Sequence, residues 1–337
     1  MSSKSSSDGF NKKEVPFFLK PNVIAVVGPT ASGKTALGVM LAEQLGGEVI
    51  SADSMQIYAQ MEIATAKPTA QEMRGVPHHL IGFLPVGSTF SVAQYKDVCY
   101  RCIDEILSRG KTPVLVGGTG LYIDAVLRNT TFFEDANTEA RAALSAQYDA
   151  QGGEAMLERL RQIDPLSAEK LHPKDKKRIL RALEVYAATG KTLSEQNKQS
   201  HTEDAPYRFC MIGLDAADRA FLYDRINRRV DRMVQAGLVE EAKRFFALPD
   251  AGTIRQAIGY KELKPYLDNE MSLKDALSNL KMETRRYAKR QLTWFRRYAS
   301  IHWLFIDRLS PQQLLQESLR VIQLETGLRP AQGGIVT

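Results

Sequence analysis

The stretch VIAVVGPTASGKT, residues 23–35, decides the fold. It begins as an apolar run typical of a buried strand, turns at a glycine, and continues into the helical pattern TALGVMLAEQL. Residues 28–35 have the form G-x-x-x-x-G-K-T in the strand, loop and helix context that a P-loop requires. In such a loop, backbone N–H groups and the helix N-terminus face an anion, and the lysine adds a positive charge. A diphosphate or triphosphate ligand is therefore predicted.

Further strand patterns follow, and helical patterns separate the first of them. Short apolar runs rich in β-branched residues lie at 48–54, 113–120, 210–215 and 302–307. This alternation predicts an α/β fold: a P-loop NTPase-like parallel sheet flanked by helices. Ligands of such sheets bind at the carboxyl ends of the strands.

The remaining sequence is mostly helical in pattern. Between about 128 and 206 the chain is polar and alanine-rich with no strand signal, which predicts a helical insertion domain. From Asp218 the pattern is again largely helical and leads into a basic C-terminal region. We therefore expect a mobile polar tail at 1–20, an α/β core at 21–128 and 206–320, a helical insertion at 129–205, and a mobile tail at 321–337.

Composition indicates a soluble globular protein of 337 residues with a net charge of +6. Three cysteines are too few for a disulfide framework and indicate a reducing compartment. Cys99 and Cys102 form a C-x-x-C inside a helical pattern without a second cysteine pair, so two structural thiols are preferred over a zinc or redox site. No apolar run is long enough to cross a bilayer and no signal core begins the chain, so a cytoplasmic protein is expected.

The densest basic stretch is KMETRRYAKRQLTWFRRY, residues 281–298. It carries seven Lys or Arg residues against the single acid Glu283. Four aromatic residues interleave with these charges, which suits a surface that meets phosphates and bases together. They are Tyr287, Trp294, Phe295 and Tyr298. A solvated basic helix would show the same charge pattern, so the stretch alone leaves both interpretations open.

A P-loop does not specify a reaction, and Asp53 is the ambiguous residue. An NTP-hydrolysing motor is expected to carry an acid for its magnesium at the end of a second strand. The run at 113–122 ends in VGGTGLY without an acid, whereas SADSMQ at 51–56 supplies Asp53. Asp53 is therefore either a residue on the magnesium side or a base that faces an acceptor.

Five motifs resemble one family. They are GPTASGKT at 28–35, DSMQIY at 53–58, TAKP at 65–68, GGTGLY at 117–122 and TRRYAKRQLTWFR at 284–296. Together they resemble the bacterial tRNA dimethylallyltransferases, also called tRNA isopentenyltransferases, of the IPP transferase family. The resemblance runs from about Val23 to Trp303. One departure is Gly82, which stands after VPHHLI where the family usually has an acid.

The resemblance implies transfer of a dimethylallyl group from its diphosphate to the exocyclic N6 amine of the adenosine 3′-adjacent to the tRNA anticodon. Asp53 then resembles the general base. The growing charge on diphosphate would be met by Lys34, by Arg229 and by Thr35 with Mg²⁺. Implied partners are the tRNA anticodon stem-loop and dimethylallyl diphosphate, with no membrane, and a monomer is expected.

The resemblance also implies two sets of binding residues. The diphosphate-binding positions are Gly28, Pro29, Thr30, Ala31, Ser32, Gly33, Lys34 and Thr35. The tRNA-binding positions are Asp53, Ser54, Met55, Gln56, Thr119, Arg141, Lys177, Arg178, Ile179, Leu180, Arg181, Gln256, Ala257, Ile258, Gly259, Tyr260 and Lys261. Among them, Gln56 can both donate to and accept from a base edge. Thr119 would also suit a helix N-cap, and both roles can hold at once.

Three alternatives are open. An adenylate isopentenyltransferase would share the P-loop and the base, but a free nucleotide does not require so much positive surface. A P-loop small-molecule kinase would turn over ATP and leaves DSMQIY unexplained. A non-catalytic RNA-binding protein would not need a base opposite a phosphate site.

Overall fold

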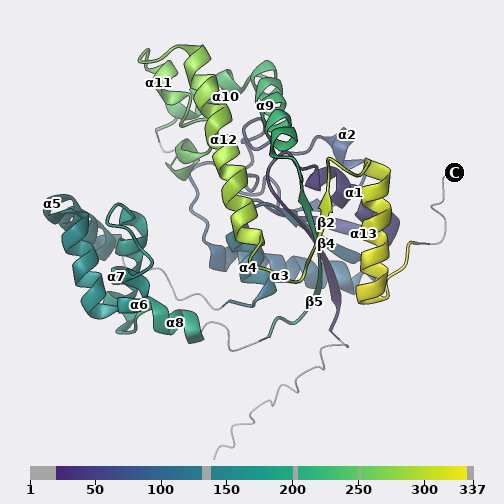
Figure 1. Ribbon diagram of the computed structural model, residues 1–337, viewed down its shortest axis with the longest axis horizontal. Coiled ribbons are helices and arrows are strands. Elements are labelled where there is room, and N and C mark those ends of the chain that lie inside the picture. Colours follow the sequence, from purple (N-terminus) through teal and green to yellow (C-terminus); the bar gives the residue numbers. More distant parts are fainter. Residues whose placement is uncertain (1–19, 131–137, 200–203, 250–251, 332–337) are drawn as a thin grey trace, which may run out of the picture. The chain divides into compact units, whose positions relative to one another are not determined.

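The computed structural model describes residues 20–130, 138–199, 204–249 and 252–331. The described residues form two compact units: the first takes those within 20–90, 97–123 and 206–331, and the second those within 91–96 and 124–205. The first unit contains a six-stranded, entirely parallel sheet in the order β3-β2-β4-β1-β5-β6 (Figure 1). The strands are β1 Asn22–Val27, β2 Gly47–Ala52, β3 His78–His79, β4 Thr112–Gly117, β5 Arg208–Asp215 and β6 Ile301–Phe305.

Helices cover both faces of this sheet. α1 (Lys34–Leu45) and α13 (Pro311–Thr326) bury Leu37, Leu41 and Ile322 against strand residues such as Val26. α3 (Val92–Ser108) and α4 (Gly120–Leu127) lie on the opposite face (Figure 1). The predicted P-loop-type α/β fold is thus confirmed.

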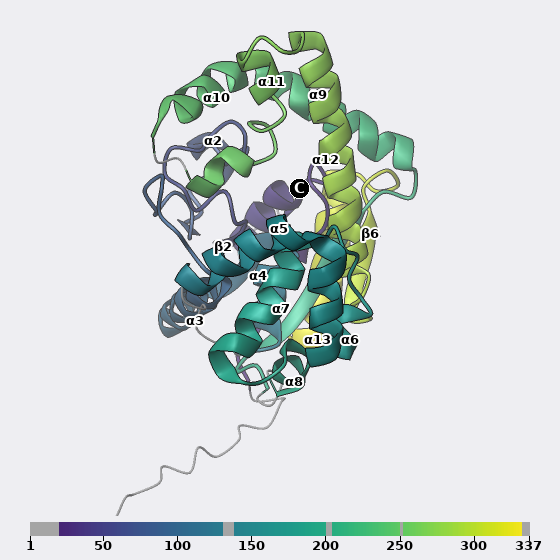
Figure 2. The same ribbon diagram turned by 90° about the vertical axis from the view of Figure 1, so that its left-hand side faces the viewer.

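A further group of helices gathers beyond one end of the sheet, as Figures 1 and 2 show. They are α9 Arg219–Gln235, α10 Leu238–Ala247, α11 Lys264–Leu267 and α12 Leu273–Phe295, with the short α2 Ala70–Met73 and a 3-10 turn at Gly252–Gln256 nearby in the same unit. Helices α9 to α12 and residues 57–61 enclose a second apolar core that includes Met61, Leu238 and Tyr260. This core fixes the loops that follow β2.

Within its described residues, the second unit consists of helices joined by loops, with no strand. Its helices are α5 Thr138–Ile163, α6 Pro165–Ala168, α7 Lys176–Thr189 and α8 Leu193–Gln199. They close around their own apolar cluster, which includes Met156, Leu160 and Leu183. α5 kinks at Gly152, whose φ of 83° lies in the left-handed region that favours glycine.

The structure corrects the expected C-terminal boundary. We predicted a mobile tail from residue 321, but α13 continues to Thr326 because Val321 and Ile322 are buried on the sheet. The helix starts with a capping box between Ser310 and Gln313. The predicted tail residues 1–19 and 332–337 lie outside the described part of the chain. The short edge strand β3 was not predicted, because two histidines carry no strand signal.

The cysteines have the structural role preferred from the sequence. Cys99 and Cys102 lie in α3, and both are buried free thiols. Burial raises the pKa of Cys102 to about 12, which keeps it protonated and unreactive. Within the described ranges, no group of three or more His, Cys, Asp or Glu could hold a metal ion. Nor is any helix there both long and apolar enough to span a bilayer.

Candidate active site

The P-loop joins β1 to α1 at the carboxyl end of the sheet. Gly28 has φ 143°, and a Cβ there would lie 2.4 Å from the carbonyl oxygen of Leu214 on the neighbouring strand β5. Gly33 has φ 92° directly before the first helical residue, Lys34. Ala31 is also left-handed, with φ 63°, and its carbonyl accepts a 2.8 Å hydrogen bond from Nε of Arg225. The loop therefore has the tight turns that an anion cradle requires.

A cavity of about 260 Å³ opens beside this loop and brings together residues from distant motifs. Its lining includes every predicted catalytic residue, namely Lys34, Thr35, Asp53 and Arg229. Gln56 and the segment 256–259 also line it. Separate parts of the chain thus supply a phosphate cradle, a carboxylate and an arginine to one site.

Asp53 follows β2 and organises the turn DSMQ. Its Oδ1 accepts hydrogen bonds from the backbone N–H of Met55 at 2.9 Å and of Gln56 at 3.3 Å. Among the described residues, no hydrogen bond to Oδ2 of Asp53 is found. One oxygen therefore holds the turn, while the other can accept a proton.

The DSMQ turn is joined to the GGTG turn that follows β4. Oγ1 of Thr119 accepts a hydrogen bond from the N–H of Ser54 at 3.0 Å, and the N–H of Thr119 donates to the carbonyl of Ala52 at 3.1 Å. Gly117 permits this contact, because a Cβ there would lie 2.2 Å from the Ala52 carbonyl oxygen. The Thr119 hydroxyl thus bonds to the neighbouring turn, while its carbonyl accepts from the N–H groups of Tyr122 and Ile123 at the start of α4.

Lys34 and Arg229 make the cavity electropositive. Burial and, after it, the charge of Arg229 lower the pKa of Lys34 to about 7, and Asp53 acts in the opposite direction. Burial is also the main reason why the pKa of Arg229 is lowered, with Asp53 again opposing. Two cations confined with one carboxylate favour an anionic ligand that restores the full charge of Lys34.

This lowered pKa predicts a pH dependence of anion binding. A bound diphosphate would raise the pKa of Lys34, so binding above pH 7 takes up a proton, and affinity should fall about tenfold per pH unit there. Calorimetry with inorganic diphosphate between pH 6 and 9 would measure this. The variant Lys34→Met is the control, because the ligand's own titration affects both proteins equally. An identical pH slope in the variant would contradict the assignment.

Gln291 on α12 was missed by sequence reasoning and connects the two halves of the site. Its Oε1 accepts from the N–H of Thr30 in the P-loop at 2.8 Å, and its Nε2 donates to the carbonyl of Gly118 at 2.9 Å. The side chain is buried, at 6% exposure. Helical spacing could have revealed it, because Thr284, Ala288, Gln291 and Phe295 recur on one buried face.

If the site transfers a group as the resemblance implies, we expect Gln291→Met to lower the rate constant by about 10- to 100-fold, because the P-loop and the GGTG turn would lose their common anchor. Methionine keeps the volume and removes both hydrogen bonds. Single-turnover transfer measures the effect. The matched control is Gln196→Met in the helical unit, another buried glutamine, at 3% exposure. Equal rates in the two variants would contradict this role.

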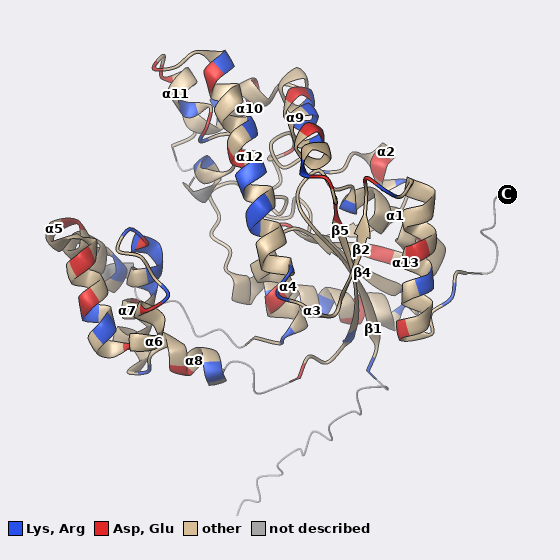
Figure 3. Cartoon of the chain, in the orientation of Figure 1, with Lys and Arg blue, Asp and Glu red and all other residues tan. Residues whose placement is uncertain are grey.

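The aromatic residues of the basic stretch are placed differently from one another. Phe295 is fully buried, so its expected contact with bases is wrong. Tyr287 lines the cavity, and burial raises its pKa well above the ordinary value, with Asp53 adding to the shift. Trp294 carries the guanidinium of Arg297 over its ring, at 4.0 Å from the centroid. Figure 3 shows Lys and Arg recurring along α12.

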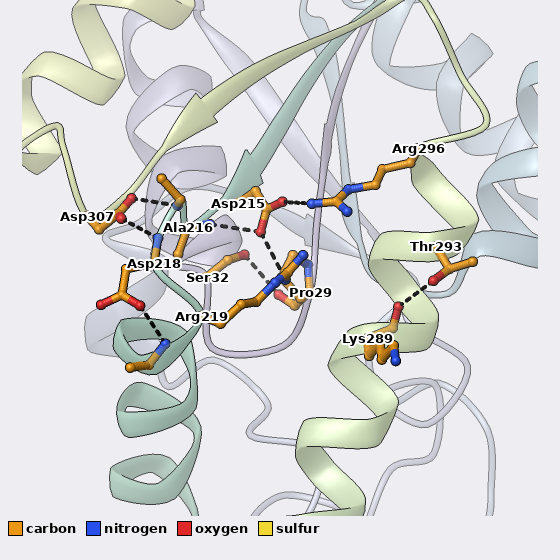
Figure 4. Close-up of polar contacts among 12 residues, drawn as sticks. Pro29, Ser32, Asp215, Ala216, Asp218, Arg219, Lys289, Thr293, Arg296 and Asp307 are labelled. Atoms are coloured by element: carbon orange, nitrogen blue, oxygen red, sulfur yellow. Dashed lines mark hydrogen bonds and ion pairs between the residues drawn. The ribbon is translucent and has the colours of Figure 1, made fainter.

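The C-terminal end of α12 is tied to the sheet by an ion-pair cluster, drawn in Figure 4. Asp215, buried at the end of β5, pairs with Arg296 at 2.9 Å and with Arg219 at 3.6 Å. With Lys289, these two arginines line a second hollow of about 250 Å³ between α9 and α12. The ion pair of Arg296 with Asp215 thus fixes the C-terminal end of α12 to β5.

The predicted tRNA-binding residues divide by burial. In the helical unit, the side chains of Ile179 and Leu180 are buried in the apolar cluster, while Lys177 and Arg178 are exposed. Arg141 and Arg181 both pair with buried Glu184. In the other unit, Ala257 and Tyr260 are also buried, so the side chain of Tyr260 is not available to RNA in this structure.

Gly82, the departure from the family pattern, has a backbone role. Its φ is 60°, and its N–H donates to the carbonyl of Gln56 at 2.8 Å. A Cβ at this position would lie 3.1 Å from Nζ of Lys67. Without a carboxylate there, Lys67 donates to the carbonyls of Tyr58 and Ala59. The loop therefore keeps its anchor to the site.

Comparison with known proteins identifies the family. The family model of the IPP transferases matches residues 56–298. A tRNA dimethylallyltransferase of Halalkalibacterium halodurans is 48% identical over 288 residues, covering 85% of this chain and 91% of that protein. One of Geobacillus kaustophilus is 49% identical over 284 residues, covering 83% and 89%.

Solved structures agree with this result. A full-length tRNA isopentenylpyrophosphate transferase from Bacillus halodurans aligns with a TM-score of 0.68 at 44% identity, over 91% of this chain and 97% of that one. A eukaryotic dimethylallyltransferase acting on tRNA aligns with a TM-score of 0.75 at 27% identity, over 93% and 81%. The chain belongs to the IPP transferase family.

Proposed function

We propose that the protein transfers a dimethylallyl group from dimethylallyl diphosphate to the N6 amine of the adenosine 3′-adjacent to the anticodon of tRNAs, releasing diphosphate. The observation that carries this proposal is a single cavity lined by the P-loop residues Lys34 and Thr35, by Arg229 and by Asp53. Relatives named tRNA dimethylallyltransferase support the same reaction.

The acceptor side needs a base. The N6 lone pair is delocalised into the adenine ring, so the amine is a weak nucleophile, but it becomes strongly acidic as the carbon–nitrogen bond forms. Oδ2 of Asp53 takes this proton, while Oδ1 stays bonded to the DSMQ turn. A carboxylate of ordinary pKa suffices for such a late proton transfer.

The donor side needs positive charge. As the allylic carbon–oxygen bond breaks, negative charge grows on diphosphate and the allyl fragment becomes cation-like. Lys34, Arg229 and the P-loop amides would stabilise the leaving group. The lowered pKa values of both cations are the cost of burying them before the anion arrives.

Enzymes of this family use a prenyl diphosphate and generally depend on a divalent metal ion. We propose Mg²⁺, held by the Thr35 hydroxyl together with phosphate oxygens. The donor set fits, because Mg²⁺ favours phosphate and hydroxyl oxygens over a closed protein cage, and no such cage exists among the described residues. When bound, the ion would neutralise part of the diphosphate charge.

The acceptor base must leave its stack to reach the cavity. Gln56 is suited to hold it, although its amide is already oriented: Oε1 accepts from Ser51 at 3.0 Å and Nε2 donates to the Thr65 carbonyl at 3.2 Å. One N–H and one lone pair remain for an adenine edge. Exposed Lys and Arg side chains of α12 and of residues 177–181 would bind the RNA phosphates, which makes binding salt-sensitive.

A single chain carries all these groups, so we propose that the protein acts as a monomer. We also propose that it acts in the cytoplasm.

The experiment uses labelled dimethylallyl diphosphate, Mg²⁺ and one acceptor at a time. We expect label in unmodified tRNA. Label only in AMP would place the protein among the free-nucleotide enzymes. No label in either acceptor, with ATP turnover in its place, would move it to the kinases.

A further inference from the structure

A buried carboxylate next to the site, but not in its lining, has four hydrogen-bond donors around it. Glu241 on α10 is 1% exposed. Its Oε2 accepts from the N–H of Glu62 at 3.1 Å and of Ile63 at 2.9 Å. Its Oε1 accepts from the N–H of Ala64 at 2.9 Å and from the hydroxyl of Tyr260 at 2.7 Å. Three successive backbone amides thus form a nest around one side chain.

The turn held by Glu241 forms part of the cavity wall. Ala64, Thr65 and Ala66 line the cavity. The carbonyl of Thr65 accepts hydrogen bonds from Nε2 of Gln56 at 3.2 Å and from Nη2 of Arg229 at 3.4 Å. The Thr65 carbonyl oxygen therefore orients both Gln56, the proposed adenine contact, and Arg229, the proposed diphosphate contact. The position of that oxygen depends on the turn.

Packing alone would not place a charge here. Glu241 lies among Leu238, Val239, Ala242 and Phe245 on the buried face of α10. A carboxylate in such a setting is costly unless hydrogen bonds compensate it. Three of the four hydrogen-bond donors are backbone amides of residues 62–64. The compensating bonds therefore hold this turn in place.

The same arrangement explains the motif QAIGYK, residues 256–261. Tyr260 is fully buried and gives its hydroxyl to Glu241. Gly259 has φ 110°, and a Cβ there would lie 3.3 Å from Cβ of Ala64; its N–H donates to Oε2 of Glu262 at 2.9 Å. The motif therefore contacts the turn at 62–64 directly through Gly259 and contacts Glu241 through Tyr260.

We infer that Glu241, supported by Tyr260, is a positioning residue that sets Arg229 and Gln56 through the turn at 62–65 and the Thr65 carbonyl. This inference rests on the proposed function of the site. It assigns the motifs TAKP and QAIGYK a shared role in holding the site.

The first test measures single variants. In Glu241→Gln an NH₂ group replaces one acceptor and faces an N–H donor, and we expect kcat/KM for dimethylallyl diphosphate to fall by about 100-fold, with a raised KM. Tyr260→Phe removes only the hydroxyl and should lose about 10-fold. Tyr207→Phe is the matched control: its hydroxyl donates to Asp104 at 2.7 Å and it is similarly buried, at 5% exposure, but at the start of β5. It should keep wild-type kinetics.

The second test separates positioning from a general loss of stability. If Glu241 acts through Arg229, Glu241→Gln should weaken the binding of inorganic diphosphate in the wild-type background and change it less than about threefold when Arg229→Ala is already present. The inference would be overturned if Glu241→Gln weakened diphosphate binding by the same factor with and without Arg229→Ala. It would also be overturned if Glu241→Gln left KM unchanged and only lowered the fraction of active protein. If Glu241→Gln does not fold, Tyr260→Phe in the same two backgrounds gives the answer. A wild-type protein that binds diphosphate but transfers no label would instead contradict the proposed function.

Discussion

Replacing Asp53 with asparagine is expected to lower the single-turnover rate of transfer to tRNA by about 10²- to 10⁴-fold, the range of a lost general base. Asparagine keeps the Oδ1 acceptor for the N–H groups of Met55 and Gln56, so the DSMQ turn should persist. Its amide cannot take the N6 proton. Rapid quenching with labelled donor at saturating tRNA measures the rate constant.

The control for this variant is Asp224→Asn on the exposed side of α9, where the carboxylate pairs with Arg228. It should retain the wild-type rate. Affinity for inorganic diphosphate, measured for Asp53→Asn, should stay close to that of the wild type. A rate within threefold of wild type in Asp53→Asn would exclude a base role and favour a role for Asp53 near the magnesium ion.

Replacing Arg229 with alanine should lower kcat/KM by about 100- to 1000-fold, as for other preorganised contacts to a developing anion. The guanidinium lines the cavity beside Lys34, and burial makes its contribution large. Arg228→Ala is the matched control, because the neighbouring side chain is 74% exposed and pairs with Asp224. Surface pairs of this kind contribute little. Similar losses in both variants would indicate a general electrostatic effect and contradict a specific contact.

The fold could be predicted because its signals are local. Alternating strand and helix patterns, and a P-loop in its expected context, are short-range features of residues 23–54 and 113–120. The two-residue strand β3 carries no such signal, since its pairing with Val49 and Ile50 decides it. The end of α13 was placed too early, because burial of Val321 and Ile322 depends on tertiary packing.

The site could be predicted only as far as each residue acts within its own motif. Lys34, Asp53 and Arg229 were expected in one site, and they line one cavity. Gln291 and Glu241 act on turns more than 100 residues away. Helical spacing can mark Gln291 as buried, but no local pattern reveals the partners of either side chain. The basic composition of residues 281–298 also concealed the buried face of α12. For Tyr260, a motif match suggested RNA contact where the structure shows a buried hydroxyl.

The most direct measurement is the location of the modification. Unmodified tRNA, dimethylallyl diphosphate and Mg²⁺ are incubated with wild-type protein or Asp53→Asn, and the RNA is digested and sequenced by mass spectrometry. The account predicts one dimethylallyl group on N6 of the adenosine 3′-adjacent to the anticodon with the wild type, and almost none with the variant. A group at another nucleotide, or equal modification by both proteins, would contradict it.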